Sequence, residues 1–180
     1  MVLLIGGASH AGKTLLAQRL LERYLWPYTS LDHIKMGLIR GCPDCGFTAL
    51  DPDGAIEEKL WGVVKGMVEV CTENCQNLIL EGCYLPPERV AGLVGGEVKA
   101  FYLIFSPAYI RSHFGEIIGH EHAIERRNYP ETRTAEEFVE ENTALKARCE
   151  SAGVSYYEIQ SDYGTELQHV CDSLDQVLGR

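Results

Sequence analysis

The feature that most constrains this chain is a glycine-rich segment close to its first residue. Gly7-Ala8-Ser9-His10-Ala11-Gly12-Lys13-Thr14 matches the spacing G-x-x-x-x-G-K-[ST] of a Walker A phosphate loop. The apolar run Val2-Leu3-Leu4-Ile5 precedes it, and a helical pattern opens at Lys13 directly after it. A strand, a glycine turn and a helix in this order predict a cradle for a phosphate group.

The residue types in this segment suit the binding of a nucleoside triphosphate. Glycines let backbone N–H groups converge on a phosphate because no Cβ is in the way. The first turn of the helix directs unpaired N–H groups and the positive end of its dipole at the same anion. We expect Lys13 to reach the β- and γ-phosphates and the Thr14 hydroxyl to ligate Mg²⁺. The predicted nucleotide-binding residues are Gly7, Ser9, His10, Ala11, Gly12, Lys13, Thr14 and Leu15. The structural alternative is a glycine-rich turn without a ligand.

Length and charge limit the remaining possibilities. The 180 residues suffice for a single domain, 1–180, with a full core. A formal net charge of −10 disfavours nucleic-acid binding, because such a surface repels phosphate backbones. No apolar run approaches the ~18 residues of a membrane span, so we expect no membrane contact. We find no export signal and expect a cytoplasmic protein.

Hydrophobic patterning predicts strands that alternate with helices. Strands are expected at 2–5, 28–31, 77–81, 98–105 and 154–159, and helices at 13–25, 33–40, 53–71, 86–93, 134–149 and 165–178, with a further helix from about 108. Asp53 is the expected N-cap of its helix, and Thr134 with Glu137 forms a capping box. This alternation predicts a parallel sheet covered on both faces, a three-layer α/β/α fold. Ligands of such sheets bind beyond the carboxyl ends of the strands.

Two carboxylates follow predicted strands at that edge. Asp32 could accept or orient the proton of a substrate hydroxyl that attacks the γ-phosphorus, and we assign it to catalysis and substrate binding. The alternative is an N-cap for the helix that begins at His33, and one residue can do both. Glu81 could hold Mg²⁺ through a water molecule or position the acceptor. Its alternative is a solvent-facing acid at the end of a strand.

A polar segment between the fourth strand and the capping box resembles a lid, at about 113–133. Arg111, Arg126, Arg127 and Arg133 lie in or beside it. A mobile arginine can stabilise the negative charge that phosphoryl transfer spreads over the equatorial oxygens. We assign Arg126 or Arg127 to catalysis and Arg111 to nucleotide binding. A solvated charged surface is the alternative.

The seven cysteines include four with possible metal spacing. Cys42-Pro43-Asp44-Cys45 has the spacing of a zinc knuckle, and Cys71 with Cys75 could complete a four-sulfur site. Reduced thiols are the alternative.

The chain resembles the P-loop small-molecule kinases: adenylate, shikimate and gluconate kinases, and bacterial proteins labelled adenylate kinase-like or 2-phosphoglycerate kinase-like. The resemblance rests on Gly7 to Thr14, Ser30-Leu31-Asp32-His33 through Leu38-Ile39-Arg40, Leu80-Glu81-Gly82 and the arginine-bearing segment. It implies a P-loop NTPase fold whose five-stranded sheet has the order 2-3-1-4-5, with ATP on the phosphate loop and a lid. It also implies that Arg40 binds an anionic group of the acceptor and that Asp32 faces its hydroxyl.

The chain departs from this family after the third strand. Adenylate kinases tend to carry a Phe-Pro-Arg turn there, whereas this chain has Cys83-Tyr84-Leu85-Pro86. The acceptor arginine of that turn is missing, which argues against a nucleoside monophosphate. We place Tyr84 of this turn with Arg40 among the substrate-binding residues.

The sequence therefore predicts an ATP- and Mg²⁺-dependent kinase that acts on a small molecule. The alternatives are a nucleoside monophosphate kinase, a regulatory protein that binds a nucleotide without transferring phosphate, and a zinc-stabilised interaction domain. The sequence does not identify the acceptor, the oligomeric state, or whether the nucleotide is ATP or GTP.

Overall fold

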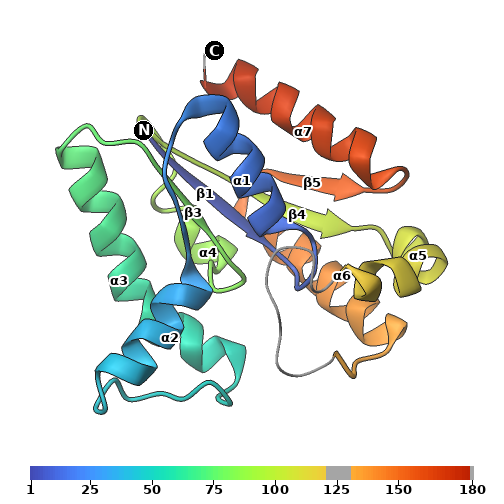
Figure 1. Cartoon of the computed structure of the whole chain (residues 1–180), viewed down its shortest axis with the longest axis horizontal. Coiled ribbons are helices and arrows are strands. Elements are labelled where there is room, and N and C mark those ends of the chain that lie inside the picture. The colour runs from blue at the N-terminus through green and yellow to red at the C-terminus, as the bar shows by residue number, and fades with distance from the viewer. Residues whose placement is uncertain (121–130, 179–180) are drawn as a thin grey trace.

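A computed structural model describes residues 1–120 and 131–178 of the chain. Strands and helices alternate through these residues (Figure 1). Their order is β1 (Val2–Gly7), α1 (Lys13–Tyr24), β2 (Tyr28–Ser30), α2 (Leu31–Gly41), α3 (Asp53–Glu73), β3 (Leu78–Glu81), α4 (Pro87–Val90), β4 (Val98–Phe105), α5 (Pro107–Gly119), α6 (Ala135–Ala152), β5 (Tyr156–Ile159) and α7 (Tyr163–Leu178).

The strands form one parallel sheet in the order β2-β3-β1-β4-β5, which confirms the predicted fold class. The strand β1 lies at the centre, where Val2 pairs with Leu78 of β3 on one side and with Val98 of β4 on the other. All six residues of β1 are buried, as a strand covered on both faces requires. Because every strand runs in the same direction, the ends of β1, β2 and β3 meet at one edge of the sheet.

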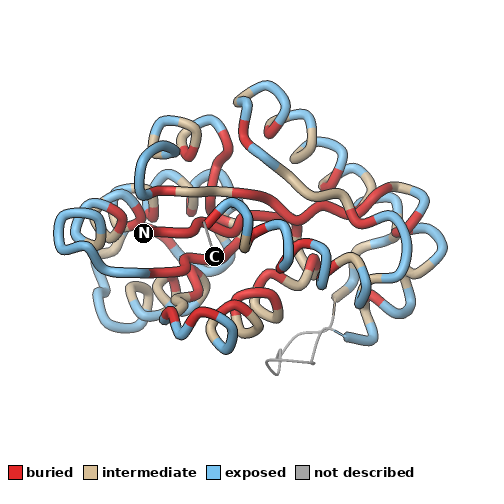
Figure 2. Tube along the Cα trace, turned by 90° about the horizontal axis from the view of Figure 1, so that it is seen from above, coloured by how far each residue is buried: buried red, intermediate tan, exposed pale blue. Residues whose placement is uncertain are grey.

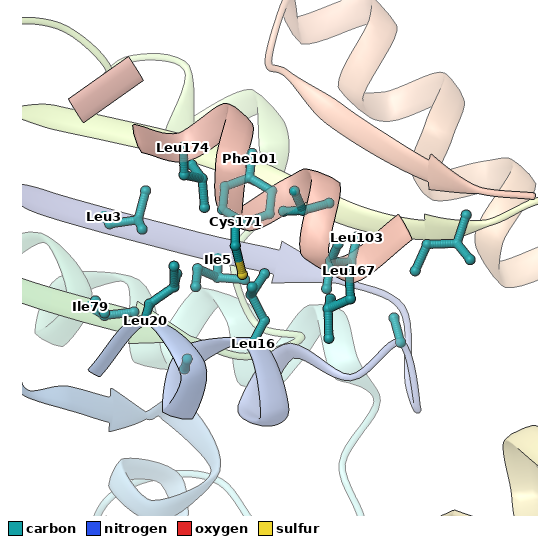
Figure 3. Packing of buried hydrophobic residues seen from close by; sticks show 14 of the residues in the cluster. Leu3, Ile5, Leu16, Leu20, Ile79, Phe101, Leu103, Leu167, Cys171 and Leu174 are labelled. Carbon is teal, nitrogen blue, oxygen red and sulfur yellow. The ribbon is translucent and has the colours of Figure 1, made fainter. Parts of the chain in front are cut away.

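Helices α1 and α7 cover one face of the sheet. Figure 3 shows Leu16 and Leu20 of α1 gathered with Leu167 and Cys171 of α7 over the central strands. The apolar stripe predicted for the first helix is therefore the side that packs on the sheet. This packing fixes the start of α1, and with it the phosphate loop (residues 7–14), against the end of β1.

The opposite face is covered by α3, α4 and the second half of α6. Ile56, Leu60 and Val64 of α3 pack with Leu4 of β1 and Cys149 of α6 in a second buried cluster. Figure 2 shows the buried trace of the sheet between exposed helix surfaces. The three-layer architecture thus has a core on each side of the sheet.

Several element boundaries differ from the sequence predictions. Helix α2 begins at Leu31, so Asp32 lies inside its first turn and is not the N-cap, which is Ser30. Asp53 is the first residue of α3 and Pro52 is its N-cap, so the predicted cap was also wrong. The capping box of Thr134 and Glu137 is confirmed.

The predicted lid is only partly described. Residues 113–119 belong to α5, which is longer than the patterning suggested, and residues 131–133 lead into α6. Arg126 and Arg127 lie outside the described residues. Within residues 1–120 and 131–178, none of the helices combines the length and apolar character that crossing a membrane requires.

Candidate active site

The phosphate loop is shaped by close contacts at its glycines. Gly7 has φ 149°, and a Cβ there would lie 2.6 Å from the Leu103 carbonyl oxygen. Gly12 has φ 82°, and a Cβ there would lie 1.6 Å from the hydroxyl oxygen of Tyr163. Neither position has space for a side chain, so both glycines are required for this backbone path. This backbone path is typical of phosphate loops, in which backbone amides bind an anion, although here the Ser9 N–H is bonded to Glu141 and the Ala11 N–H to the Ala8 carbonyl oxygen.

The ammonium group of Lys13 is held inside the loop. Its Nζ donates a hydrogen bond of 2.7 Å to the Ala8 carbonyl oxygen, and the residue is buried. Burial lowers the pKa of Lys13, but the nearby Cys83, Glu81 and Asp32 outweigh it and raise the pKa above its ordinary value. Lys13 is therefore a cation at neutral pH, as contact with phosphate requires.

A hydroxyl and a carboxylate lie side by side at the start of α1. The Thr14 Oγ1 donates a 3.1 Å hydrogen bond to Glu81 Oε1, and Glu81 is only 2% exposed. Burial raises the pKa of Glu81, opposed by a hydrogen bond to Ser30, by the charge of Lys13 and by the bond to Thr14. Oxygen donors of these two types are what Mg²⁺ prefers beside a nucleotide, so the pair fits that ion.

Asp32 has a partner that the sequence analysis did not identify. The Nζ of Lys35, one helical turn later on α2, lies 2.7 Å from Asp32 Oδ1 and 2.7 Å from the Tyr84 hydroxyl oxygen. Lys35 is buried, whereas 43% of the Asp32 side chain is exposed. One carboxylate oxygen is thus fixed by Lys35 while the side chain still faces solvent.

Lys13, Thr14, Asp32 and Glu81 line one cavity of about 310 Å³ at the carboxyl edge of the sheet. It runs from Asp32 and Glu81, past Lys13 and Thr14, to aromatic residues of α5 and α7. The remaining lining residues are His10, Gly12, Leu15, Arg19, Ser30, Cys83, Phe105, Tyr109, Glu116, Ile117, His120 and Tyr163. The cavity joins the phosphate loop to the carboxylate expected to face an acceptor.

Other predicted site residues lie away from this cavity. Arg111 makes two hydrogen bonds of 2.8 Å to Glu136 on the surface, because its guanidinium matches that carboxylate. Arg40 is exposed at the last turn of α2. Tyr84 is buried and contacts Lys35 rather than the cavity. The roles assigned to these three residues stay predictions.

Among the described residues of the predicted lid, Arg133 is connected to the phosphate loop through Glu141. Its Nη1 donates a 2.8 Å hydrogen bond to Glu141 Oε2, and its Nη2 donates one of 2.7 Å to Glu131 Oε2. Glu141 in turn accepts a 2.8 Å hydrogen bond from the Ser9 backbone N–H. The loop, the start of α6 and this arginine are thereby connected.

The four-cysteine zinc site is contradicted. Cys42 and Cys45 precede α3, whereas Cys71 and Cys75 lie at its far end (Figure 1). A helix of that length spans roughly 30 Å, far more than a zinc site allows. No group of three or more metal-binding side chains occurs among the residues that the structure describes.

Most of the cavity lining was missed by the sequence analysis, and Lys35 and Tyr163 illustrate two different reasons. Lys35 follows Asp32 at the i, i+3 spacing that brings helical side chains together, so the sequence contained a usable signal. Tyr163 is 151 residues from Gly12 in sequence, and no local sequence pattern predicts that the two residues are in contact.

Comparison with known proteins supports the fold. No family model matches the sequence, and neither does any curated protein. Among solved structures, shikimate kinase from Aquifex aeolicus is similar over the full length of both chains, with a TM-score of 0.61 and 12% identity. Shikimate kinase from Acinetobacter baumannii in complex with shikimate has a TM-score of 0.59 and 13% identity, covering 99% of this chain and 92% of that one.

A third similar structure is deoxyadenosine kinase from M. mycoides, with a TM-score of 0.56 and 11% identity over 98% of this chain and 100% of that one. The chain therefore has the fold of the P-loop proteins that bind nucleoside triphosphates. Within that class, its fold is that of the small-molecule kinases.

Proposed function

We propose that this protein is an ATP- and Mg²⁺-dependent kinase that transfers the γ-phosphoryl group to a hydroxyl of a small molecule. One observation supports this most directly. Lys13, the Thr14–Glu81 pair and Asp32 line a single cavity, with the phosphate loop at one side and an available carboxylate at the other. Phosphoryl transfer is mostly a matter of positioning and charge stabilisation, and these groups supply both.

The phosphate loop and Lys13 bind the triphosphate in this proposal. Lys13 exchanges its hydrogen bond to the Ala8 carbonyl oxygen for contacts with the β- and γ-phosphates. The exchange is favourable because a hydrogen bond between two charged groups is stronger than one to a neutral carbonyl oxygen. The Thr14 hydroxyl and Glu81 hold Mg²⁺. When bound, this ion neutralises charge on the β- and γ-phosphates.

Asp32 orients the acceptor. Its Oδ1 is bound by Lys35, which leaves the other oxygen to accept the proton of a substrate hydroxyl. The lysine keeps the carboxylate in one rotamer, and a fixed rotamer favours a reactive geometry. Arg126 or Arg127 completes the site at the γ-phosphate. Arg40, exposed on the last turn of α2, contacts an anionic group of the acceptor, and Tyr84 acts only through its bond to Lys35.

A transfer assay with γ-labelled MgATP tests the proposal. Two sets of candidate acceptors are tested. The first set contains small hydroxy acids and phosphorylated sugars, and the second contains AMP, CMP, UMP and GMP. We expect label on a hydroxyl acceptor of the first set. Asp32→Asn should reduce that transfer at least about a hundredfold, the usual scale of a positioned acid or base, while exposed Asp44→Asn should not.

The other outcomes identify the alternatives. Label only on a nucleoside monophosphate would replace the proposal with a nucleoside monophosphate kinase. Binding of MgATP with no labelled product in either set, and none from a metabolite extract, would indicate a regulatory nucleotide-binding protein.

A further inference from the structure

Two cysteines are the first and last residues of the tight turn that follows α2. Cys42 is the C-cap of α2, and its backbone N–H donates a 2.8 Å hydrogen bond to the Leu38 carbonyl oxygen. The Cys45 N–H donates a 3.0 Å hydrogen bond to the Cys42 carbonyl oxygen, which closes a β-turn with Pro43 at its second position. Such a turn keeps its first and fourth Cα atoms within about 7 Å, and a disulfide usually joins Cα atoms about 4.4–6.8 Å apart. The backbone therefore holds these two cysteines close enough for a disulfide.

The two thiols differ in their surroundings. Cys42 is exposed, whereas Cys45 is half-buried and packs against the buried cluster that contains Leu60 of α3. The Cys45 Sγ also donates a 3.3 Å hydrogen bond to the carbonyl oxygen of Phe47, which is a buried member of the same cluster. Cys42 is thus accessible to a dissolved oxidant, and Cys45 is anchored beside it.

We propose that Cys42 and Cys45 form a reversible dithiol–disulfide pair, and that the disulfide ties the end of α2 to the segment anchored by Phe47. The C-x-x-C spacing is typical of redox-active cysteine pairs. The oxidant is a low-molecular-weight disulfide of the glutathione type. Neither cysteine is among the residues that line the cavity, so this inference goes beyond the proposed kinase function.

The reaction consists of two successive thiol–disulfide exchanges. Cys42 loses its thiol proton, and its thiolate attacks one sulfur of glutathione disulfide, which forms a mixed disulfide and releases one glutathione thiolate. The Cys45 thiolate then attacks the Cys42 sulfur, which forms the protein disulfide and releases the second glutathione thiolate. Each released thiolate takes up one proton. Two protein thiols are thereby oxidised by two electrons while one glutathione disulfide is reduced to two thiols, and excess reduced glutathione reverses both steps.

The disulfide acts on the helix that carries Asp32 and Lys35. A covalent bond across the turn prevents Cys42 from moving away from Cys45, so it restricts local opening of the last turn of α2. Arg40 lies in that turn and is exposed. Oxidation therefore changes how freely the end of α2 moves, and amide hydrogen exchange measures that change.

The experiment compares the parent protein before and after incubation with glutathione disulfide. Free thiols are alkylated, the protein is digested, and the peptides are identified by mass spectrometry. We expect the peptide with Cys42 and Cys45 to escape alkylation and to have lost two hydrogen atoms, and reduced glutathione to restore both thiols. Amide exchange of residues 38–41 should slow about threefold or more in the oxidised protein, while residues 163–178 of α7 exchange as before.

Single variants separate the two steps of the reaction. Cys45→Ser should stop at the first step and retain one glutathione on Cys42, whereas Cys42→Ser should react more slowly because Cys45 is half-buried. The matched control is Cys75→Ser, which removes an exposed cysteine beyond the end of α3 and should form the disulfide as the parent does.

Three results would overturn the inference: glutathione that stays on Cys42 in the parent, recovery of both cysteines as alkylated thiols, or a disulfide that leaves exchange at the end of α2 unchanged. No step of this experiment uses a nucleotide. Parent protein that binds no MgATP would therefore refute the kinase proposal and leave the cysteine pair untouched, so the two failures are distinguishable.

Discussion

Single residues of this protein combine burial with charge in ways that serve the cavity. Lys35 is the clearest case, since a buried ammonium is costly unless it is paired. Burial lowers the pKa of Lys35, but its bonds to Asp32 and Tyr84 outweigh that effect and raise it. The lysine stays charged, and its charge is used to orient one carboxylate.

Replacing Lys35 should therefore impair transfer more than nucleotide binding. We expect Lys35→Met to lower kcat in the transfer assay about tenfold, because Asp32 loses the partner that fixes its rotamer. The Kd for MgATP should change by less than about twofold, and Lys35→Arg should recover part of kcat. The exposed Lys59→Met is the control. An unchanged kcat in Lys35→Met would show that Asp32 needs no such support.

At the scale of elements, α6 is tied to the sheet by one buried side chain. Asn142 is fully buried, accepts a 2.8 Å hydrogen bond from the Phe105 N–H and donates one of 2.8 Å to the Phe138 carbonyl oxygen. The Asn142 side chain on α6 thus provides the hydrogen-bond acceptor for the last backbone N–H of β4. The same helix carries Glu141, so this contact also sets the distance between α6 and the phosphate loop.

Asn142→Ala should destabilise the protein by about 1–3 kcal/mol, because it leaves the Phe105 N–H buried without its partner. Urea denaturation followed by circular dichroism measures this difference. The neighbouring exposed Thr143→Ala should stay within about 0.5 kcal/mol of the parent. Equal midpoints for Asn142→Ala and the parent would mean that water replaces the amide at no cost.

Regular elements were predictable because their patterns are local. The strands β1 and β3 and most of β4 follow from apolar runs, and the start of α6 follows from the reciprocal pair Thr134 and Glu137. Boundaries were less predictable: Asp53 is the first residue of α3 and Asp32 is the second residue of α2, and neither is an N-cap, because propensity does not fix the terminal residue of a helix.

The site was predictable only where it is contiguous in sequence. The phosphate loop is eight successive residues, and Glu81 ends an obvious strand. The Ser9–Glu141 and Gly12–Tyr163 contacts join residues more than 130 positions apart, which no spacing encodes. The zinc hypothesis considered only the spacing within each cysteine pair, whereas the helix predicted at 53–71, which is α3 in the structure, already separated the two pairs.

At the scale of the whole molecule, the parallel sheet brings Lys13, Asp32 and Glu81 to one edge. The strand order places β1 between β3 and β4, so the loop after β1 faces Glu81 of β3 and the aromatic residues that follow β4. An acidic protein can bind a triphosphate there because Lys13 and the loop amides concentrate positive charge at that point. Binding of the nucleotide is thus the property on which the other roles depend.

Calorimetric titration with MgATP of the parent protein and of Lys13→Ala tests that property most directly. We predict saturable binding at one site in the parent and affinity reduced roughly tenfold to a hundredfold in Lys13→Ala, the effect of losing a charge-assisted contact of about 1.5–3 kcal/mol. Exposed Lys65→Ala should bind as the parent does. No heat with the parent protein, or equal affinity in Lys13→Ala, would contradict the assignment of this loop to a nucleoside triphosphate.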